Sequence, residues 1–480
     1  MSQSAAAFRM SGRPRAVPAR RLLTVWLIIL VLGSGIAWAL AGDWLTAAGL
    51  WVLAAGWRYL RTEDEPPVLA LAFTFQWVQV TAGIYYHAFT GRRLDVMDLS
   101  DYRPMVLIGL GCLLALLLGL AVGMRLIRRS RPKGDGAANS AFSWRTLIVL
   151  YLTSTALTGT VQQFAWQLPA LTQGVLALTY GRLALLFLIF YRLSQPRVRG
   201  GWIVVLLAGE IALGFTGYFA GFKEPLMVAA IALTSVFDRR RTTHWITLII
   251  LGVVMVLTGT LWMGIRTEYR ADFESEAFAE SREARLERIG QLSSDLLQGG
   301  FGELVSNVEP FVDRLWAVYY PALAVSRVPS LLPYENGAIL GSAVRHVLTP
   351  RFLFPEKMAL PSDSEEVREY SGVWVAGAEE GTSMAFGYAA ESYVDFGVPL
   401  MFLPVAVYGL LMGVAFQWWL QVIRSRELAV ALVVSVFWLS LYLFERSWAK
   451  TLGGAGTLMI YLGGAVYLID RLMAWRGRFR

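Results

Sequence analysis

Two cations in a proline-rich segment, Thr349–Lys357 (TPRFLFPEK), give the sharpest chemical signal in this chain. Pro350 and Pro355 restrict the backbone, so Arg351 and Lys357 should project from a stiffened loop. Arginine offers a planar fork of donors and lysine a compact charge, and both suit a phosphate or a diphosphate. The equally good alternative is a loop whose cations meet lipid headgroups or neighbouring carboxylates.

Acidic and aromatic residues follow where the next apolar segment begins, in Phe386–Leu400 (FGYAAESYVDFGVPL). At the rim of an apolar bundle, the carboxyl group of Glu391 should have a raised pKa and could act as a general acid or base. The alternative, in which Glu391 only pairs with a cation of the preceding loop, has at least equal support.

Two further charges, Arg182 and Glu210, interrupt apolar segments. At 1.5 Å of helix rise per residue, both lie about 12–15 Å from the same membrane face. An unpaired charge at that depth costs at least about 2.5–3.5 kcal/mol. We therefore expect an ion pair that ties two helices together, and the alternative is that Arg182 lines a cavity reaching a bound diphosphate.

The elements that must position these residues are membrane-spanning helices, because 56% of the chain is hydrophobic. A hydrocarbon core of about 30 Å needs about 20 apolar residues per helix. Twelve segments are candidates for such helices, of which several are short: 22–40, 44–60, 68–89, 105–126, 144–160, 172–193, 202–219, 223–237, 244–264, 386–422, 428–443 and 453–473.

The positive charges fix an orientation for these segments. With the N-terminus inside, the five short outside loops hold only Arg92, Arg93, Arg103, Lys223, Arg446 and Lys450. Both termini are then cytoplasmic, and a long acidic loop lies outside. The first segment has a signal-peptide-like end at Ala39–Ala41, but its length favours a retained helix. The net charge of +8 reflects this positive-inside pattern and does not indicate a nucleic-acid partner.

The predicted organisation is all-α and has three parts. Residues 1–264 form a membrane bundle of nine spans, 265–385 form an extracytoplasmic loop with amphipathic helices, and 386–480 form three more spans. Within the loop we expect a charged helix over 272–298 and a short helix over 338–348. The only cysteine, Cys112, lies within a span, so no disulfide can form within the chain.

Together these elements resemble the bacterial oligosaccharide repeat-unit polymerases of the Wzy type, which are O-antigen polymerase-like. The resemblance rests on Pro350-Arg351, on Pro355-Glu356-Lys357, and on the helix entry Gly387–Glu391–Tyr393–Phe396-Gly397. The motif-bearing match covers about 345–415, and elsewhere the similarity is one of layout, with a GT-C-like arrangement. The turn Gly221–Pro225 departs from the Ser/Gly-rich turn with an arginine that the family leads us to expect, and Lys223 is the candidate for that role.

The resemblance implies a metal-free and cofactor-free glycosyl transfer at the outer face of the bacterial inner membrane. Its substrate would be an oligosaccharide carried on undecaprenyl diphosphate, and its partners would include a flippase and a chain-length regulator. The candidates for binding the departing diphosphate are Lys223, Arg266, Arg345, Arg351 and Lys357. The predicted catalytic residues, which would act on the attacking hydroxyl, are Glu391 and His346.

Two other functions stay open. A secondary transporter or a flippase for lipid-linked sugar would also have about twelve spans, although transporters usually show two similar halves. A glycan ligase would expel the same lipid diphosphate, so residue chemistry does not separate it from a polymerase. Asp95, Asp98 and Asp101 could hold a divalent cation, but a solvated acidic loop is the favoured interpretation and we expect no metal site.

Overall fold

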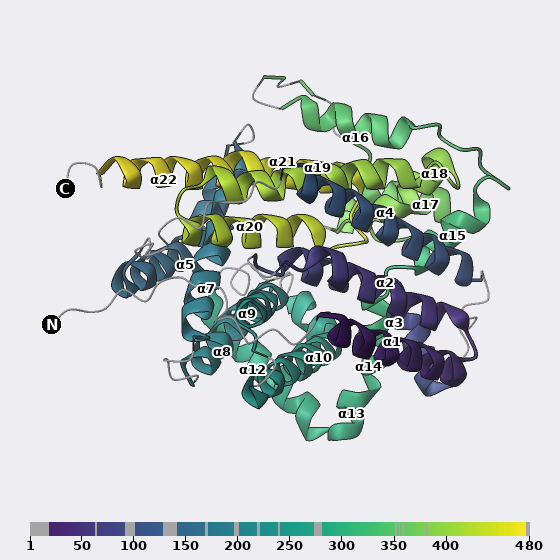
Figure 1. The fold of residues 1–480 in the computed structure, drawn as a ribbon, viewed down its shortest axis with the longest axis horizontal. Coiled ribbons are helices and arrows are strands. Elements are labelled where there is room, and N and C mark those ends of the chain that lie inside the picture. The colour runs from purple at the N-terminus through teal and green to yellow at the C-terminus, as the bar shows by residue number, and fades with distance from the viewer. Residues whose placement is uncertain are drawn as a thin grey trace. The chain divides into compact units, whose positions relative to one another are not determined.

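The computed structural model describes residues 19–62, 65–91, 101–127, 142–168, 171–195, 201–217, 221–238, 241–272, 281–350, 353–354, 356–357, 360–380 and 382–476. Every regular element within these ranges is a helix, and no β-strand occurs among them (Figure 1). The prediction of an all-α chain is therefore confirmed.

Six helical segments in the described part of the chain are long and apolar enough to cross a membrane. They are Val68–Thr90, Arg103–Ile127, Thr172–Leu193, Thr242–Ala271, Phe402–Val422 and Trp448–Trp475. The other predicted spans are also helical, but they are shorter or less apolar: α1 (Ala19–Ala41), α2 (Trp44–Leu60), α5 (Trp144–Trp166), α8 (Gly201–Phe215), α9 (Lys223–Ser235) and α20 (Arg426–Leu441). This architecture is that expected of a multi-pass helical membrane protein.

The predicted continuous span 386–422 is wrong. The structure divides it into a short helix, α18 (Tyr388–Phe396), and a second helix, α19 (Phe402–Val422). Helix α18 ends at Gly397, whose φ of +62° is unfavourable for other residue types, and Pro399 follows with no N–H to continue the helix. Only α19 is long enough to span, so Glu391 lies outside the candidate membrane-spanning helices.

The chain forms two compact units that differ from the predicted three-part division along the sequence. The first contains Met1–Gly181 and Trp316–Arg480, and the second contains Arg182–Leu315. The predicted division follows membrane topology, which these packing contacts do not test.

The first unit is organised around α4 (Arg103–Ile127), which packs closely along α19. Both helices carry a Gly-x-x-x-Gly pair, Gly119/Gly123 and Gly409/Gly413. A Cβ at Gly119 would lie 2.1 Å from the Ala406 carbonyl oxygen, and one at Gly413 would lie 2.4 Å from that of Leu120. The glycines therefore let the two backbones touch, as in close crossings of membrane helices.

Other helices of this unit pack on one another and on the α4–α19 pair. Helix α3 (Val68–Thr90) packs against α20, and the last candidate span is built from α21 (Trp448–Thr457), the π-helix η3 (Leu458–Gly463) and α22 (Gly464–Arg476). The part of this unit that precedes α18 in the sequence contains three helices and a 3₁₀ turn: α15 (Tyr319–Arg327), α16 (Ala338–Leu348), α17 (Asp363–Ser371) and η2 (Ala378–Glu380). The predicted helix over 338–348 is confirmed as α16. Helix α6 (Thr172–Thr179) packs on η3.

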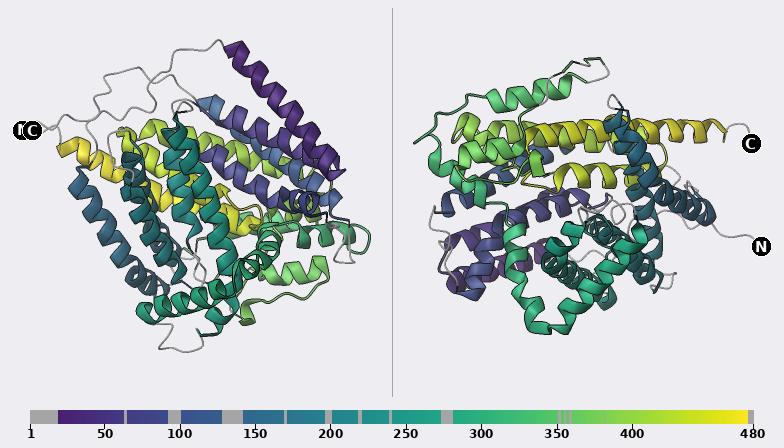
Figure 2. Two further views of the ribbon diagram at one scale, coloured as in Figure 1. Left: turned by 90° about the horizontal axis from the view of Figure 1, so that it is seen from below. Right: turned by 180° about the vertical axis from the view of Figure 1, so that it is seen from behind.

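The second unit contains most of α7 (Gly181–Leu193), together with α8, α9 and α10 (Thr242–Ala271). Three helices of the predicted outside loop, α12 (Arg282–Gln298), α13 (Phe301–Ser306) and α14 (Val308–Leu315), pack against α10 (Figure 2). A Cβ at Gly259 would lie 2.2 Å from the Phe311 ring, which shows how closely α14 approaches α10. Helix α10 extends seven residues past the predicted span end at 264, so Arg266 lies on a helix.

Candidate functional site

Two buried glutamines of α3 hold the loop that frames the candidate site in the first unit. Gln76 Nε2 donates to the Leu441 carbonyl, and Gln79 Nε2 donates to that of Tyr442 at 3.1 Å. The side-chain oxygen of Gln79, Oε1, accepts the Phe444 N–H at 2.7 Å. These bonds satisfy polar groups that the end of α20 leaves without helical partners. In an apolar bundle, such bonds fix the 441–444 backbone in one position.

Helix α18 starts directly on this loop. Gly387 has a φ of +94°, and a Cβ there would lie 2.6 Å from the Phe444 carbonyl oxygen, so only glycine fits. The Tyr388 N–H donates to the Arg446 carbonyl at 2.8 Å, and the Tyr388 hydroxyl donates to Gln76 Oε1 at 2.7 Å. The first turn of α18 is thereby anchored, which positions Glu391 one turn later.

Glu391 points to the first residues of α21. Its Oε2 accepts the Trp448 N–H at 2.7 Å, while Ser392 Oγ accepts the Trp448 indole N–H at 2.9 Å. Glu391 is 1% exposed, and nothing within the described residues hydrogen-bonds its Oε1. Burial, and then the negative charge of Glu366, hold the pKa of Glu391 well above its usual range, against the opposing effect of the Trp448 N–H. The raised pKa favours the protonated form of the carboxyl group, which could give up a proton as a general acid.

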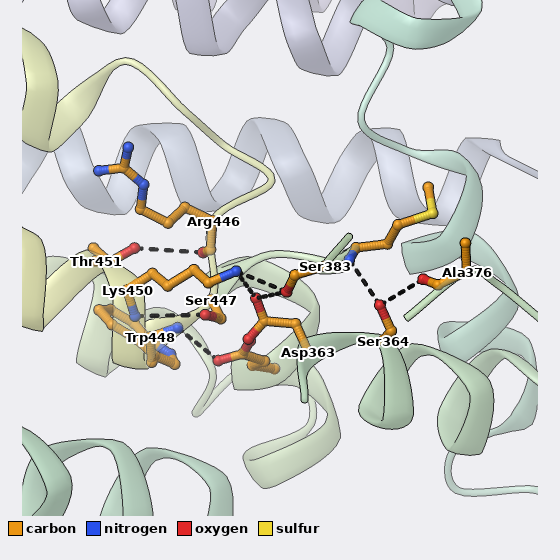
Figure 3. A network of polar contacts seen from close by, with 11 residues as sticks. Asp363, Ser364, Ala376, Ser383, Arg446, Ser447, Trp448, Lys450 and Thr451 are labelled. Atoms are coloured by element: carbon orange, nitrogen blue, oxygen red, sulfur yellow. Dashed lines mark hydrogen bonds and ion pairs between the residues drawn. The ribbon is translucent and has the colours of Figure 1, made fainter. Parts of the chain in front are cut away.

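A polar network beside Glu391 joins α17 to the start of α21 (Figure 3). Lys450 Nζ forms an ion pair with Asp363 and donates to Ser383 Oγ at 2.9 Å. Ser447 caps α21, because its hydroxyl accepts the Lys450 N–H. The network ties the chain around residue 383 and the α17 N-terminus to the helix that contacts Glu391.

Helix α16 carries two of the predicted site residues and is held in place by α18. The Asp395 carboxylate accepts the N–H groups of Ile339 and Leu340 at 3.0 and 2.8 Å, so it caps α16 from another element. Arg345 is exposed on α16 and His346 is partly buried. Lys357 lies in the turn that follows, and its Nζ donates to the His346 carbonyl.

A cavity of about 340 Å³ opens between α16 and α17. Its wall includes Ile339 and Tyr370 and three carboxylates, those of Glu365, Glu366 and Glu369. Burial, with the neighbouring carboxylates of Asp363 and Glu369, raises the pKa of Glu366 from 4.5 to about 7.

The raised pKa of Glu366 predicts a pH-dependent stability. The folded state keeps a proton that the unfolded chain releases above about pH 4.5, so the free energy of unfolding should fall as the pH rises from about 4.5 to 7. Glu366→Gln should remove this part of the slope and be more stable than the parent protein at pH 7.5. Thermal unfolding in detergent at pH 5 and at pH 7.5 measures the effect, with exposed Glu287→Gln on α12 as the control. An unchanged slope in Glu366→Gln would contradict the assignment.

The other predicted diphosphate ligands are distributed differently. Arg351 lies outside the described residues. Lys223 is at the start of α9 and Arg266 is on α10, both in the second unit. Within the first unit the structure brings α16, with Arg345 and His346, against both α18 and α21. The joint role of these cations and Lys357 in binding a diphosphate stays a prediction.

The predicted pair of Arg182 and Glu210 is present in the second unit. Arg182 Nη1 lies 2.7 Å from Glu210 Oε1 and 2.8 Å from Oε2. The Glu210 side chain is 1% exposed and that of Arg182 is 21% exposed, so Glu210 is buried and Arg182 is partly buried. This contact joins two apolar helices as the interpretation of a structural tie requires.

Sequence reasoning missed Gln76, Gln79 and the Lys450–Asp363 pair. The glutamines had a visible signal, since Gln76-Trp-Val-Gln79 places two amides on one face of an otherwise apolar helix. For Lys450 there was no signal in the sequence beyond its predicted location on the outer side of the membrane. Asp95 and Asp98 lie outside the described residues, and among the residues described no group of three or more His, Cys, Asp or Glu is placed to hold a metal ion.

Comparison with known proteins adds no relative. No family model matches the chain, and neither a curated protein nor a solved structure does. A functional assignment therefore depends on the residues and contacts described above.

Proposed function

We propose that this chain is a bacterial inner-membrane glycosyltransferase that polymerises oligosaccharide repeat units carried on undecaprenyl diphosphate. The proposal includes the finer architecture: about twelve spans, both termini cytoplasmic, a GT-C-like layout, and the segment 265–385 on the outer side. In this arrangement the first unit's α16, α17 and α18 lie at the outer membrane boundary, where lipid-linked repeats would be presented. A flippase would deliver the substrate, and a chain-length regulator would be a further partner.

The observation that carries the proposal is the packing of α16 against both α18 and α21. It places the element that bears Arg345 and His346 against the two elements that hold the buried Glu391 carboxyl group. Lys357 is tied to α16 through the His346 carbonyl. Cations for a diphosphate and a buried carboxyl group for acid–base chemistry thus belong to one set of adjacent elements.

The proposed reaction is a glycosyl transfer. A hydroxyl oxygen of one repeat unit bonds to the anomeric carbon of the other substrate, and the bond from that carbon to the diphosphate oxygen breaks. Lipid diphosphate leaves with the bonding electrons, and the hydroxyl proton passes to a protein group. Arg345, Arg351 and Lys357 are assigned to the growing charge on the diphosphate, with Lys223 and Arg266 as further cations. Glu391 and His346 are assigned to the proton transfer, in which a base must first be unprotonated.

The Arg182–Glu210 pair keeps a second function open, that of a transporter or flippase for lipid-linked sugar. Buried charges between apolar helices often mark transport pathways. A glycan ligase is the third candidate, since it expels the same leaving group. The glycan formed in a deletion strain separates the three. Loss of a polymerase leaves single repeat units, loss of a flippase leaves none on the surface, and loss of a ligase leaves polymer on the lipid carrier.

Arg351→Ala tests the proposal directly. Loss of a preorganised charge contact to the leaving group should cost about 2.7–4 kcal/mol, or roughly a 100- to 1000-fold loss in rate. Glycan should collapse to single repeat units while protein level and membrane insertion stay normal. Arg351→Lys should restore polymer only partly, because lysine lacks the bidentate fork.

Gel analysis of surface glycan, with the protein quantified in the same membranes, measures both effects. The matched control is Arg327→Ala, which removes an arginine that lies at the end of α15 and has no assigned role in the reaction. Polymer of normal length from Arg351→Ala would remove this residue from the site. The loop would then be assigned to headgroup binding or packing.

A further inference from the structure

Helix α16 is not long enough to span a membrane, yet it packs along a helix that is. It lies against α21, the first part of the candidate span Trp448–Trp475. A Cβ at Gly453 would lie 3.6 Å from Val347 Cγ2, which locates the contact near the start of that span. The level of Gly453 in the bilayer therefore sets the level of α16.

The charges of the span define that level. Lys450 lies near one end, and Asp470 and Arg471 lie near the other. The uncharged stretch between them, Thr451–Ile469, is about 28 Å long at about 1.5 Å of rise per residue, which matches a hydrocarbon core of about 30 Å. Gly453 is then within the first turn inside the core, and α16 beside it lies at the boundary between headgroups and acyl chains.

The exposed residues of α16 and of the segment that follows it include large apolar side chains. Val344 and Leu348, one turn apart on α16, are 38% and 73% exposed, and in the following turn Leu353 and Phe354 are 63% and 50% exposed. Leu353 and Phe354 are held near the end of α16, because their N–H groups both donate to the Pro350 carbonyl at 3.0 Å. The bond from Lys357 Nζ to the His346 carbonyl connects this segment back to α16. Water contact with four large apolar side chains would cost free energy that lipid contact removes.

We propose that α16 and the turn after it form an interfacial anchor, with Val344, Leu348, Leu353 and Phe354 immersed in lipid at the Trp448 end of the last span. The partner is the boundary lipid of the membrane that this span crosses. Exposed Arg345 flanks the apolar face and extends its charged end to headgroup phosphates, while Lys357 Nζ stays bonded to the His346 carbonyl. The anchor is independent of the proposed reaction, since a transporter or ligase with this fold would use it in the same way.

Spin labels at single cysteines test the anchor in the full-length protein. The only native thiol, Cys112, is fully buried, so unsubstituted protein is the blank. Leu348→Cys and Leu353→Cys would be labelled in nanodiscs of phosphatidylethanolamine and phosphatidylglycerol. Glu365→Cys, whose side chain is exposed on α17, is the aqueous reference. Leu468→Cys, 61% exposed on α22, is the lipid reference. Collision rates with oxygen and with a water-soluble nickel complex report the surroundings.

We expect the oxygen-to-nickel collision ratio at both anchor positions to be several-fold above that of Glu365→Cys and to approach that of Leu468→Cys. A ratio equal to the aqueous reference would overturn the proposal. Low collision rates with both reagents, together with dipolar broadening between labels, would also overturn it, because they would mean that a second copy of the chain covers this face. Substitution at such exposed positions leaves the packing of α16 on α21 intact, so a folded protein is available for every measurement.

Discussion

Glu391→Gln is expected to abolish polymer formation without unfolding the protein. General acid–base catalysis contributes about 100- to 10,000-fold to a rate, and the side-chain amide of glutamine does not ionise near neutral pH. The amide oxygen of glutamine can still accept the Trp448 N–H, so the contact that fixes α18 against α21 should persist. Surface glycan should consist of single repeat units, with a normal amount of protein in the membrane.

The pH profile separates proton transfer from positioning. With its raised pKa, Glu391 as a general acid would give a rate that falls as the pH rises above that pKa, and as a general base it would give a rate that rises up to the same value. Either limb should disappear in Glu391→Gln. The matched control is Ser392→Ala, which removes the bond to the Trp448 indole N–H and keeps the carboxyl group. It should lower stability and leave the pH profile unchanged. A normal polymer from Glu391→Gln would assign Glu391 to packing alone.

The helices were predictable because hydropathy and length decide them. The error at 386–422 arose where composition stays apolar while the backbone changes direction. The signal was present in Gly397-Val-Pro399, since proline cannot continue the hydrogen bonding of a helix and glycine readily adopts a positive φ. Segment-averaged hydropathy has no term for such a break, so Glu391 was predicted at a span entry when it belongs to a separate short helix.

A contact between distant residues could be predicted only where the sequence itself indicated the position of both partners in the fold. For Arg182 and Glu210, helix rise gave each charge a depth, and the cost of leaving either unpaired supplied the reason to meet. The hydrogen bonds of Gln76 and Gln79 could not be predicted in this way, because their partners are backbone carbonyls whose positions depend on how α20 ends. The pairing of Lys450 with Asp363 depends likewise on the path of the chain from α17 to residue 383.

The largest stability effect is expected from breaking the Arg182–Glu210 pair. Removing one partner leaves the other charge buried without compensation, which typically costs about 3–5 kcal/mol. Arg182→Met and Glu210→Leu, each alone, should therefore lower the free energy of unfolding by about this amount. The double substitution should recover most of the loss, because apolar side chains of similar size can fill the space between α7 and α8. Denaturant unfolding in detergent micelles, read by tryptophan fluorescence, gives the four free energies of the double-mutant cycle.

The same four proteins decide between the structural tie and a cavity that binds diphosphate. If the pair only joins helices, the double variant should be both stable and able to make polymer of normal length. If Arg182 contacts substrate, the double variant should be stable but should form only single repeat units, since its guanidinium group is absent while the fold is intact. Single variants as stable as the parent protein would refute the energetic importance of the pair, because two bonds of 2.7 and 2.8 Å in a buried setting should not be lost without cost.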